Sequence, residues 1–158
     1  MDTAVFDADD PRFDDALAIR TRVFVEEQDV PMDREVDGLD GEATHFLLSD
    51  PEPVATARVR PHEREASASD RPNGDQREPR GGALKVERVA VLADHRGAGY
   101  GRAVMDAVEA YARREGYDEV VLHAQVPVVA FYERLGYTAE GEEFEDAGIP
   151  HRTMWKSL

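Results

Sequence analysis

Cysteine is absent from this chain of 158 residues, and lysine occurs only at Lys85 and Lys156. The lack of cysteine excludes disulfide bonds, a thiolate nucleophile and any zinc or iron–sulfur centre with cysteine ligands. No apolar run approaches the roughly 20 residues that a membrane-spanning helix requires. The first ten residues are acidic and carry no basic segment, so they do not resemble a secretory signal. We therefore expect a soluble cytoplasmic protein with no membrane partner and no metal.

Negative charge dominates the composition. The chain has 34 Asp and Glu residues against 19 Lys and Arg residues, which gives a formal net charge of -15. Such a surface repels phosphate backbones, so the composition argues against nucleic-acid binding. We interpret the acid excess and the scarcity of lysine together as an adaptation to high salt, where a screening length of about 3 Å at 1 M removes self-repulsion. Charge that merely maintains solubility is the alternative interpretation.

The order of apolar and turn-forming segments predicts an α/β protein whose mixed sheet contains one parallel crossover. Asp10-Pro11 is typical of a helix start, with Asp as the N-cap and Pro at the first helical position. Residues 60–82 are polar and rich in Pro, Gly and Ser, so we expect a flexible loop inserted into a single domain, 1–158. The predicted strands cover residues 3–6, 44–48, 54–59, 83–92, 119–124, 137–144 and 152–156, and the helices cover 10–25, 102–115 and 128–135.

A glycine-rich turn at residues 96–101 follows the apolar strand 83–92 and leads directly into a predicted helix. Glycine lets the backbone adopt positive φ and approach a ligand closely. Free N–H groups at the helix start, with the helix dipole behind them, suit a pyrophosphate, and Arg96 could add a charged hydrogen bond. A Walker loop requires Gly-Lys-Ser/Thr, and a dinucleotide fingerprint requires G-x-G-x-x-G after the first strand. The observed Arg-x-x-Gly-x-Gly spacing favours coenzyme A, with a turn that binds nothing as the alternative.

These residues resemble the acetyl-CoA motif of the GNAT superfamily of N-acetyltransferases. A second mark of that family, Phe-Tyr-x-x-x-Gly-Tyr, occurs at residues 131–137 after the next strand. The ElaA-like branch of the family is similar at residues 20–28, at the loop with Asp37 and Asp40, at His45, and at residues 124–125 and 148–151, although that branch lacks the insertion. The resemblance implies a central mixed sheet of six to seven strands with a splayed parallel pair flanked by helices. It also implies that acetyl-CoA binds to Val89, Ala90, Val91, Arg96, Gly97, Ala98, Gly99, Tyr100, Gly101, Arg102 and Phe131.

Acetyl transfer to an amine requires loss of a proton from the ammonium, polarisation of the thioester and stabilisation of the leaving thiolate. Because no cysteine is available, we expect direct attack in a ternary complex. The resemblance assigns the general acid to Tyr132. Glu87 is the candidate base, since strand alternation places it on the same face as Val89. The alternative bases are Glu27, His45 and His151.

The acceptor is expected to be a small-molecule or peptide amine. Arg20, Arg58 and Arg88 could hold a carboxylate of that acceptor, or the last two could pair with Asp37 or Asp40. The family resemblance also makes a homodimer possible. Two other functions stay open, namely a non-catalytic acyl-CoA sensor and an enzyme similar to acyl-homoserine-lactone synthases. The similarity to acyl-homoserine-lactone synthases rests on residues 22–24, Glu35, Asp37, Asp40 and Arg58. Those synthases lack the glycine-rich turn.

Overall fold

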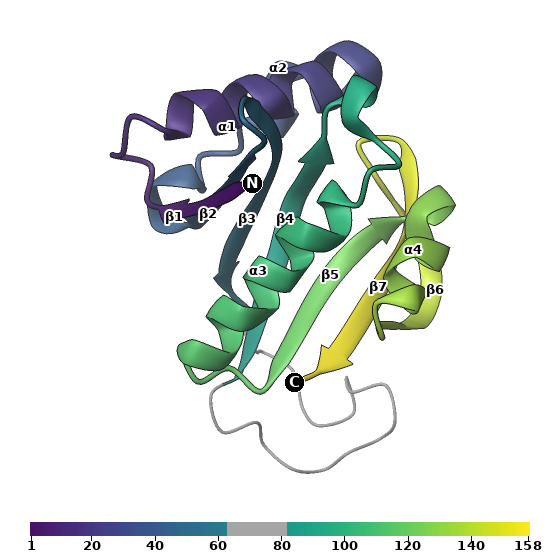
Figure 1. Cartoon of the computed structure of the whole chain (residues 1–158). Coiled ribbons are helices and arrows are strands. Elements are labelled where there is room, and N and C mark those ends of the chain that lie inside the picture. Colours follow the sequence, from purple (N-terminus) through teal and green to yellow (C-terminus); the bar gives the residue numbers. More distant parts are fainter. Residues whose placement is uncertain (63–81) are drawn as a thin grey trace. The chain divides into compact units, whose positions relative to one another are not determined.

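A computed structural model describes residues 1–62 and 82–158 of the chain. Within these ranges the strands form a seven-stranded mixed sheet in the order β1-β2-β3-β4-β5-β7-β6, which confirms the predicted fold class (Figure 1). Most of the predicted 60–82 loop, residues 63–81, lies outside the described residues. The strands are β1 (Asp2–Phe6), β2 (Thr44–Ser49), β3 (Pro53–Pro61), β4 (Ala83–Val91), β5 (Glu119–Gln125), β6 (Thr138–Asp146) and β7 (Ile149–Ser157).

Helical segments connect these strands. Their bounds are α1 (Phe13–Arg20), η1 (Thr21–Glu27), α2 (Met32–Glu35), η2 (Asp40–Glu42), η4 (Ala93–His95), α3 (Tyr100–Arg114), η5 (Val126–Val128) and α4 (Val129–Arg134). Contacts between Cα atoms divide the chain into two compact units. The first comprises residues 1–60 and 87–108, and the second comprises the described residues of 61–86 together with 109–158.

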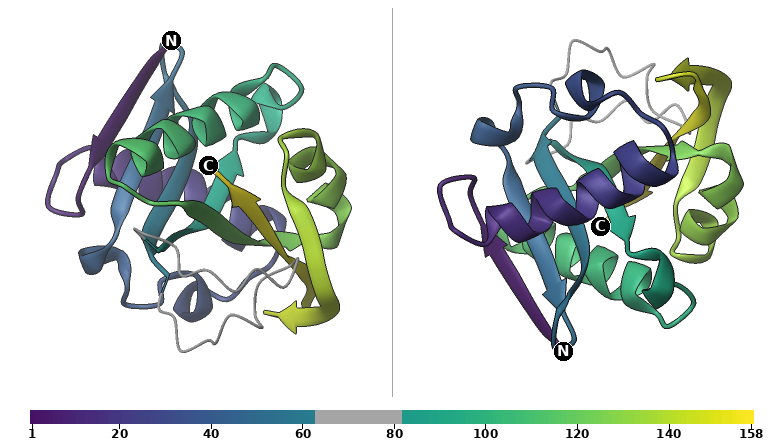
Figure 2. Two further views of the ribbon diagram at one scale, coloured as in Figure 1. Left: turned by 90° about the horizontal axis from the view of Figure 1, so that it is seen from below. Right: turned by 90° about the horizontal axis from the view of Figure 1, so that it is seen from above.

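Strand β2 is the core strand of the first unit and is buried on both faces. It pairs antiparallel with β1 and with β3. Because side chains alternate along a strand, Leu47 and Leu48 point to opposite faces of the sheet. Leu47 packs in a cluster with Ile19 and Val23, whereas Leu48 packs in a second cluster with Val54. Figure 2 shows α1 and η1 lying across one face of these strands.

The predicted helix 10–25 changes its geometry part of the way along. The helix α1 begins at Phe13 with Arg12 as its N-cap, so the predicted start at Asp10-Pro11 was two residues too early. The Asp10 carboxylate accepts the backbone N–H of Arg12 at 2.9 Å in the turn that precedes the helix. From Thr21 the chain continues as a π-helix to Glu27. The Thr21 hydroxyl donates to the Leu17 carbonyl at 2.9 Å, a side-chain bond that competes with regular helix hydrogen bonds. The acidic segment 32–42 contains the short helical segments α2 and η2, which the sequence analysis did not predict.

The second unit is built on β5, β7 and β6. Strand β5 pairs antiparallel with β7 over its whole length, and β7 pairs with β6. The parallel pairing of β5 with β4 covers only four residues, from Ala83↔Glu119 to Val86↔Leu122. Two residues after this ladder ends, Arg88 has a φ of 55°, a left-handed conformation that interrupts regular strand geometry. The two C-terminal strands are longer than the 137–144 and 152–156 predicted from the sequence.

Candidate active site

The glycine-rich turn has the backbone conformation that its sequence predicted. Gly97 and Gly99 have φ values of 82° and 88°, which a residue with a Cβ adopts only with strain. A Cβ added at either glycine would meet nothing within 4 Å, so packing does not explain them. Residues 96–99 are exposed on the surface. The turn therefore offers an open stretch of backbone that a ligand can approach.

Helix α3 starts one residue after Gly99 and supplies the free N–H groups expected of an anion site. The first N–H groups of a helix have no partner inside it. Among the described residues, no backbone bond outside the helix is donated by the N–H of residues 97–102. The first turn of α3 contains Arg102 and no acidic residue, so no carboxylate competes for the positive end of the dipole. This geometry suits a phosphate group.

Arg96 does not extend freely from this turn. Its Nε donates to the Val91 carbonyl at 2.9 Å. Its two terminal nitrogens each donate to a different carboxylate oxygen of Glu27, both at 2.9 Å. The predicted phosphate ligand is therefore held by a bidentate pair with η1, 69 residues away in the sequence. The other predicted cofactor residues of the first unit lie nearby in the chain, with Ala90 buried and Val89, Val91 and Tyr100 half-buried.

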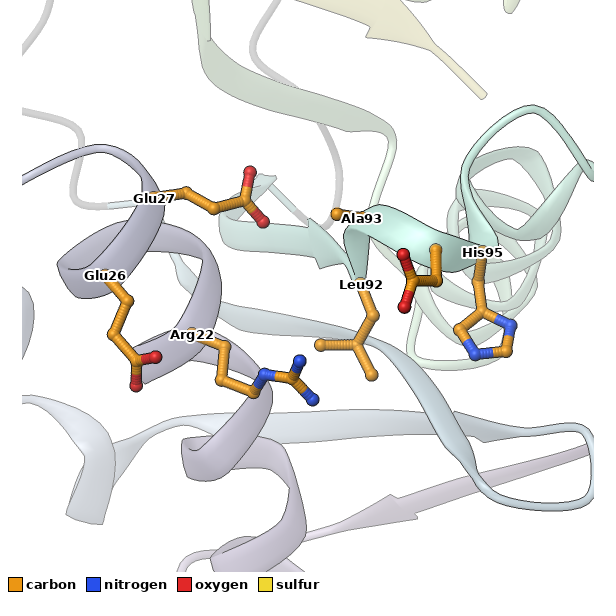
Figure 3. A pocket seen from close by; sticks show the side chains of 7 residues that line it. Arg22, Glu26, Glu27, Leu92, Ala93 and His95 are labelled. Carbon is orange, nitrogen blue, oxygen red and sulfur yellow. The ribbon is translucent and has the colours of Figure 1, made fainter.

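A pocket of about 260 Å³ lies between η1 and the segment that follows β4. Figure 3 shows Arg22, Glu26 and Glu27 on the η1 side, facing Leu92, Ala93 and His95. Asp94 completes the lining. Three carboxylates and one guanidinium line the pocket, so it is anionic at neutral pH. Arg22 and Glu26 belong to the 20–28 segment that resembles the ElaA-like branch, but the sequence analysis gave neither residue a role in a site.

A charge-balanced cluster of four arginines and four carboxylates lies elsewhere in the first unit. Arg20 and Glu35 form its core, with both side chains 1% exposed and Nε 2.6 Å from Oε1. Arg58 is also 1% exposed and pairs with Asp37 at 2.8 Å and Asp40 at 3.1 Å. The members of the cluster are Arg20, Arg58, Arg60, Arg88, Glu35, Asp37, Asp40 and Glu87. The three arginines considered for an acceptor carboxylate are thus already engaged by carboxylates of the chain.

Neighbouring arginines lower the pKa values of two acids of this cluster, Asp37 and Asp40. Burial alone would raise the pKa of Asp37, but hydrogen bonds from Arg58 and from the Leu39 N–H outweigh it and lower that pKa. Burial likewise opposes the hydrogen bonds and charges of Arg20 and Arg58 at Asp40, and the net effect lowers the pKa of Asp40. These groups therefore serve as ion-pair partners rather than as proton carriers near neutral pH.

Glu87 and His45, two of the candidate bases, lie within or beside this cluster. Both oxygens of Glu87 are engaged: Arg58 donates to Oε2, and Arg60 donates to Oε1 at 2.8 Å. His45 is fully buried, packs edge-on against Phe13 at 4.8 Å and bonds the Asp40 carbonyl through Nε2 at 3.1 Å. Burial lowers the pKa of His45, which keeps the ring neutral. The structure thus places His45 in the core of the first unit.

The remaining candidates belong to the second unit. Tyr132 on α4 is 6% exposed and lies 4.9 Å from the Phe131 ring and 5.8 Å from the Tyr137 ring. Burial raises the pKa of Tyr132, so its phenol stays protonated at neutral pH. His151 on β7 is buried, stacks on Phe144 and bonds the Ile149 carbonyl through Nδ1 at 2.6 Å.

The second unit also contains a buried polar group that sequence analysis missed. Glu109 is 5% exposed and accepts from the Tyr137 hydroxyl and from Lys156 Nζ, each at 2.8 Å. The sequence does contain an indication of this burial. Glu109 follows Met105 by four positions, so the two side chains lie on the same, otherwise apolar face of α3. A carboxylate at such a position requires a partner.

The described helices include none that is long and apolar enough to cross a bilayer. Nor do the described residues bring together three or more His, Asp or Glu side chains in a group that could hold a metal ion.

The chain is an α/β protein with a mixed sheet, and its glycine-rich turn leads into the start of α3. Residues 66–158 match the family described as the acetyltransferase (GNAT) domain. The chain belongs to the GNAT family of acetyltransferases and is an acyltransferase enzyme. It is 37% identical over 155 residues to YjcF of Bacillus subtilis, described as an uncharacterised N-acetyltransferase, with 97% of this chain and 98% of YjcF covered.

Solved structures agree with this assignment. An acyl-CoA N-acyltransferase from Pseudomonas aeruginosa superposes with a TM-score of 0.74 at 28% identity, covering 98% of each chain. ElaA of Escherichia coli superposes with a TM-score of 0.74 at 25% identity, again covering 98% of each chain. The GNAT resemblance inferred from the two motifs is confirmed, with ElaA among the structural relatives.

Proposed function

We propose that this acetyltransferase takes acetyl-CoA as its donor and a primary amine as its acceptor, with direct attack in a ternary complex. The observation that carries the donor assignment is the open turn at 96–101, whose two left-handed glycines lead into the acid-free first turn of α3. Oriented backbone N–H groups at a helix start bind phosphate groups without any side chain. The P. aeruginosa relative, described as an acyl-CoA N-acyltransferase, supports the same class of donor.

The family resemblance indicates which residues of the first unit would hold the donor. The N–H groups of residues 97–102 would bind the diphosphate, and main-chain groups of Val89, Ala90 and Val91 would bind the pantetheine arm. When bound, acetyl-CoA supplies an activated thioester carbonyl. A backbone N–H near Val91 would donate to the oxygen of that carbonyl, where negative charge develops during attack.

Tyr132 is proposed to stabilise the leaving thiolate. Its raised pKa means that the phenol is protonated throughout the neutral range and is available as a donor. A thiol has a reference pKa of about 8.5, so complete transfer of the phenolic proton to the thiolate would be uphill. Tyr132 would therefore act chiefly by donating a hydrogen bond as the charge develops. Glu87, whose oxygens both accept from arginines, is proposed as a positioning residue rather than a free base.

The proposal is tested by following CoA release from acetyl-CoA over a panel of amines, with the protein in high salt. Tyr132→Phe removes one hydroxyl and is expected to lower kcat by roughly 10²-fold or more, the lower range for an acid–base contribution. Tyr117→Phe, a half-buried tyrosine of the same unit, is the matched control and should keep the original rate. An unchanged kcat in Tyr132→Phe would remove Tyr132 from the mechanism. Binding of acetyl-CoA without CoA release for any amine would refute the proposed acceptor class.

A further inference from the structure

The side chain of Arg96 occupies a position that the donor would need. Its Nε bonds the Val91 carbonyl, a group that the proposed function assigns to the pantetheine arm. Its remaining donors are held by Glu27, which also lines the anionic pocket. Arg96 therefore connects the proposed donor site to the pocket through direct hydrogen bonds, all within the first unit.

The bond between Arg96 and Glu27 is weak enough to be exchanged. The two side chains are 46% and 36% exposed, and ion pairs at such positions contribute little because water and salt screen them. A diphosphate carries more negative charge than one carboxylate and accepts bidentate hydrogen bonds from arginine. A diphosphate bound at the turn would be a stronger partner for Arg96 than Glu27 is.

Departure of Arg96 would change the charge of the pocket. In the described structure Arg96 pairs with Glu27 and balances its charge. Glu26, visible in Figure 3, and Asp94 line the same pocket. Loss of the Arg96 partner would leave the Glu27 carboxylate unneutralised beside those two acids. A site with three carboxylates and Arg22 as its one lining guanidinium attracts cations.

We propose that Arg96 exchanges Glu27 for the diphosphate of the donor, and that the released Glu27 carboxylate then binds a cationic group of the acceptor in this pocket. The inference rests on the proposed function and adds a substrate class, an acceptor with a second cationic group such as a polyamine. It also adds an order of binding, because the pocket gains its full charge only after the donor binds. Glu27 is thereby a specificity-determining residue.

Thermodynamic coupling between two probes tests this exchange. Binding of coenzyme A and of spermidine is measured by calorimetry, each alone and each in the presence of the other, at the lowest salt that preserves the fold. Wild-type protein is expected to bind spermidine more tightly when coenzyme A is present. By linkage, spermidine must tighten coenzyme A binding by the same factor. An exposed ion pair predicts a factor of about 1.5 to 5.

Spermidine could also bind more tightly simply because coenzyme A is negatively charged. Two isosteric variants distinguish this direct attraction from the exchange of Glu27 for the diphosphate. Glu27→Gln and Glu26→Gln remove the same charge from the same pocket, but only the first removes the partner of Arg96. Glu27→Gln is expected to bind coenzyme A about 1.5- to 5-fold more tightly than wild type and to lose most of the coupling. Glu26→Gln is expected to bind spermidine more weakly and to keep the coupling.

The possible results separate a failure of the Arg96 exchange from a failure of the proposed acetyl-CoA donor. Equal coupling in both variants would overturn the exchange while leaving the donor assignment intact. Failure of spermidine to bind the protein with coenzyme A present would overturn the cationic acceptor. Failure of wild-type protein to bind coenzyme A at all would overturn the proposed donor and the exchange together.

Discussion

Replacing Arg20 with methionine is expected to destabilise the protein by about 3–5 kcal/mol, the usual effect of breaking a buried ion pair from one side. Arg20 and Glu35 are each 1% exposed, and Arg20 also donates to Asp40 at 2.8 Å. The substitution would leave four carboxylates against three arginines in the cluster. Arg88, whose Nε lies 3.5 Å from the Glu35 carboxylate, would compensate only in part. For a chain of this length the loss corresponds to a fall in Tm of roughly 6–20 °C.

Urea unfolding followed by circular dichroism measures this effect, with Arg12→Met as the matched control. Arg12 forms a similar pair with Asp10 at 2.7 Å, but its side chain is 51% exposed, so no measurable change is expected. The double variant Arg20→Met/Glu35→Met should recover most of the loss, because two apolar side chains then replace two buried charges. A loss in Arg20→Met no larger than that in Arg12→Met would refute the reasoning.

Three further predictions follow from other features. Gly99→Ala should destabilise the protein by about 1 kcal/mol through its positive φ and weaken coenzyme A binding, whereas Gly41→Ala, which also has open space around it but no positive φ, should do neither. Because the pKa values of Asp37 and Asp40 are lowered by folding, their stabilisation should be complete above about pH 4 and decline as pH falls towards the folded values; a urea midpoint that does not change between pH 5 and pH 3 would contradict this. The net charge of -15 predicts that secondary structure measured by circular dichroism increases with added salt, and full structure in dilute buffer would oppose a high-salt adaptation.

Local chemistry made some features of this protein predictable. Gly97 and Gly99 predicted a turn with positive φ, and both residues have positive φ in the structure. The helix predicted at 102–115 forms as α3, and Val104, Val108 and Ala112, which helical spacing places on one face, are all fully buried. Each of these inferences depends on a few residues adjacent in the chain, where backbone sterics and helical periodicity decide the outcome.

Features that depend on distant partners could not be predicted in the same way. The partner of Arg96 is Glu27, 69 residues away, and nothing in the sequence near either residue indicates that they pair. The buried cluster poses the same difficulty, since Arg58 could have paired with any of several carboxylates. The sequence named Asp37 and Asp40 as options, but the central role of Glu35 is clear only from its burial. The change from α1 to the π-helix η1 also lacked a sequence signal.

Arg88 illustrates how one position can serve two opposing requirements. Its φ of 55° favours glycine, yet its guanidinium donates to the Glu35 carbonyl at 3.1 Å and to Asp37 at 3.2 Å. A substitution by glycine would remove the backbone strain but lose the contacts of the guanidinium. A substitution by any other residue would keep the strain and also lose the contacts. In a scan of all substitutions, position 88 should therefore tolerate almost nothing. Asp29, a left-handed residue on the surface, should accept glycine readily.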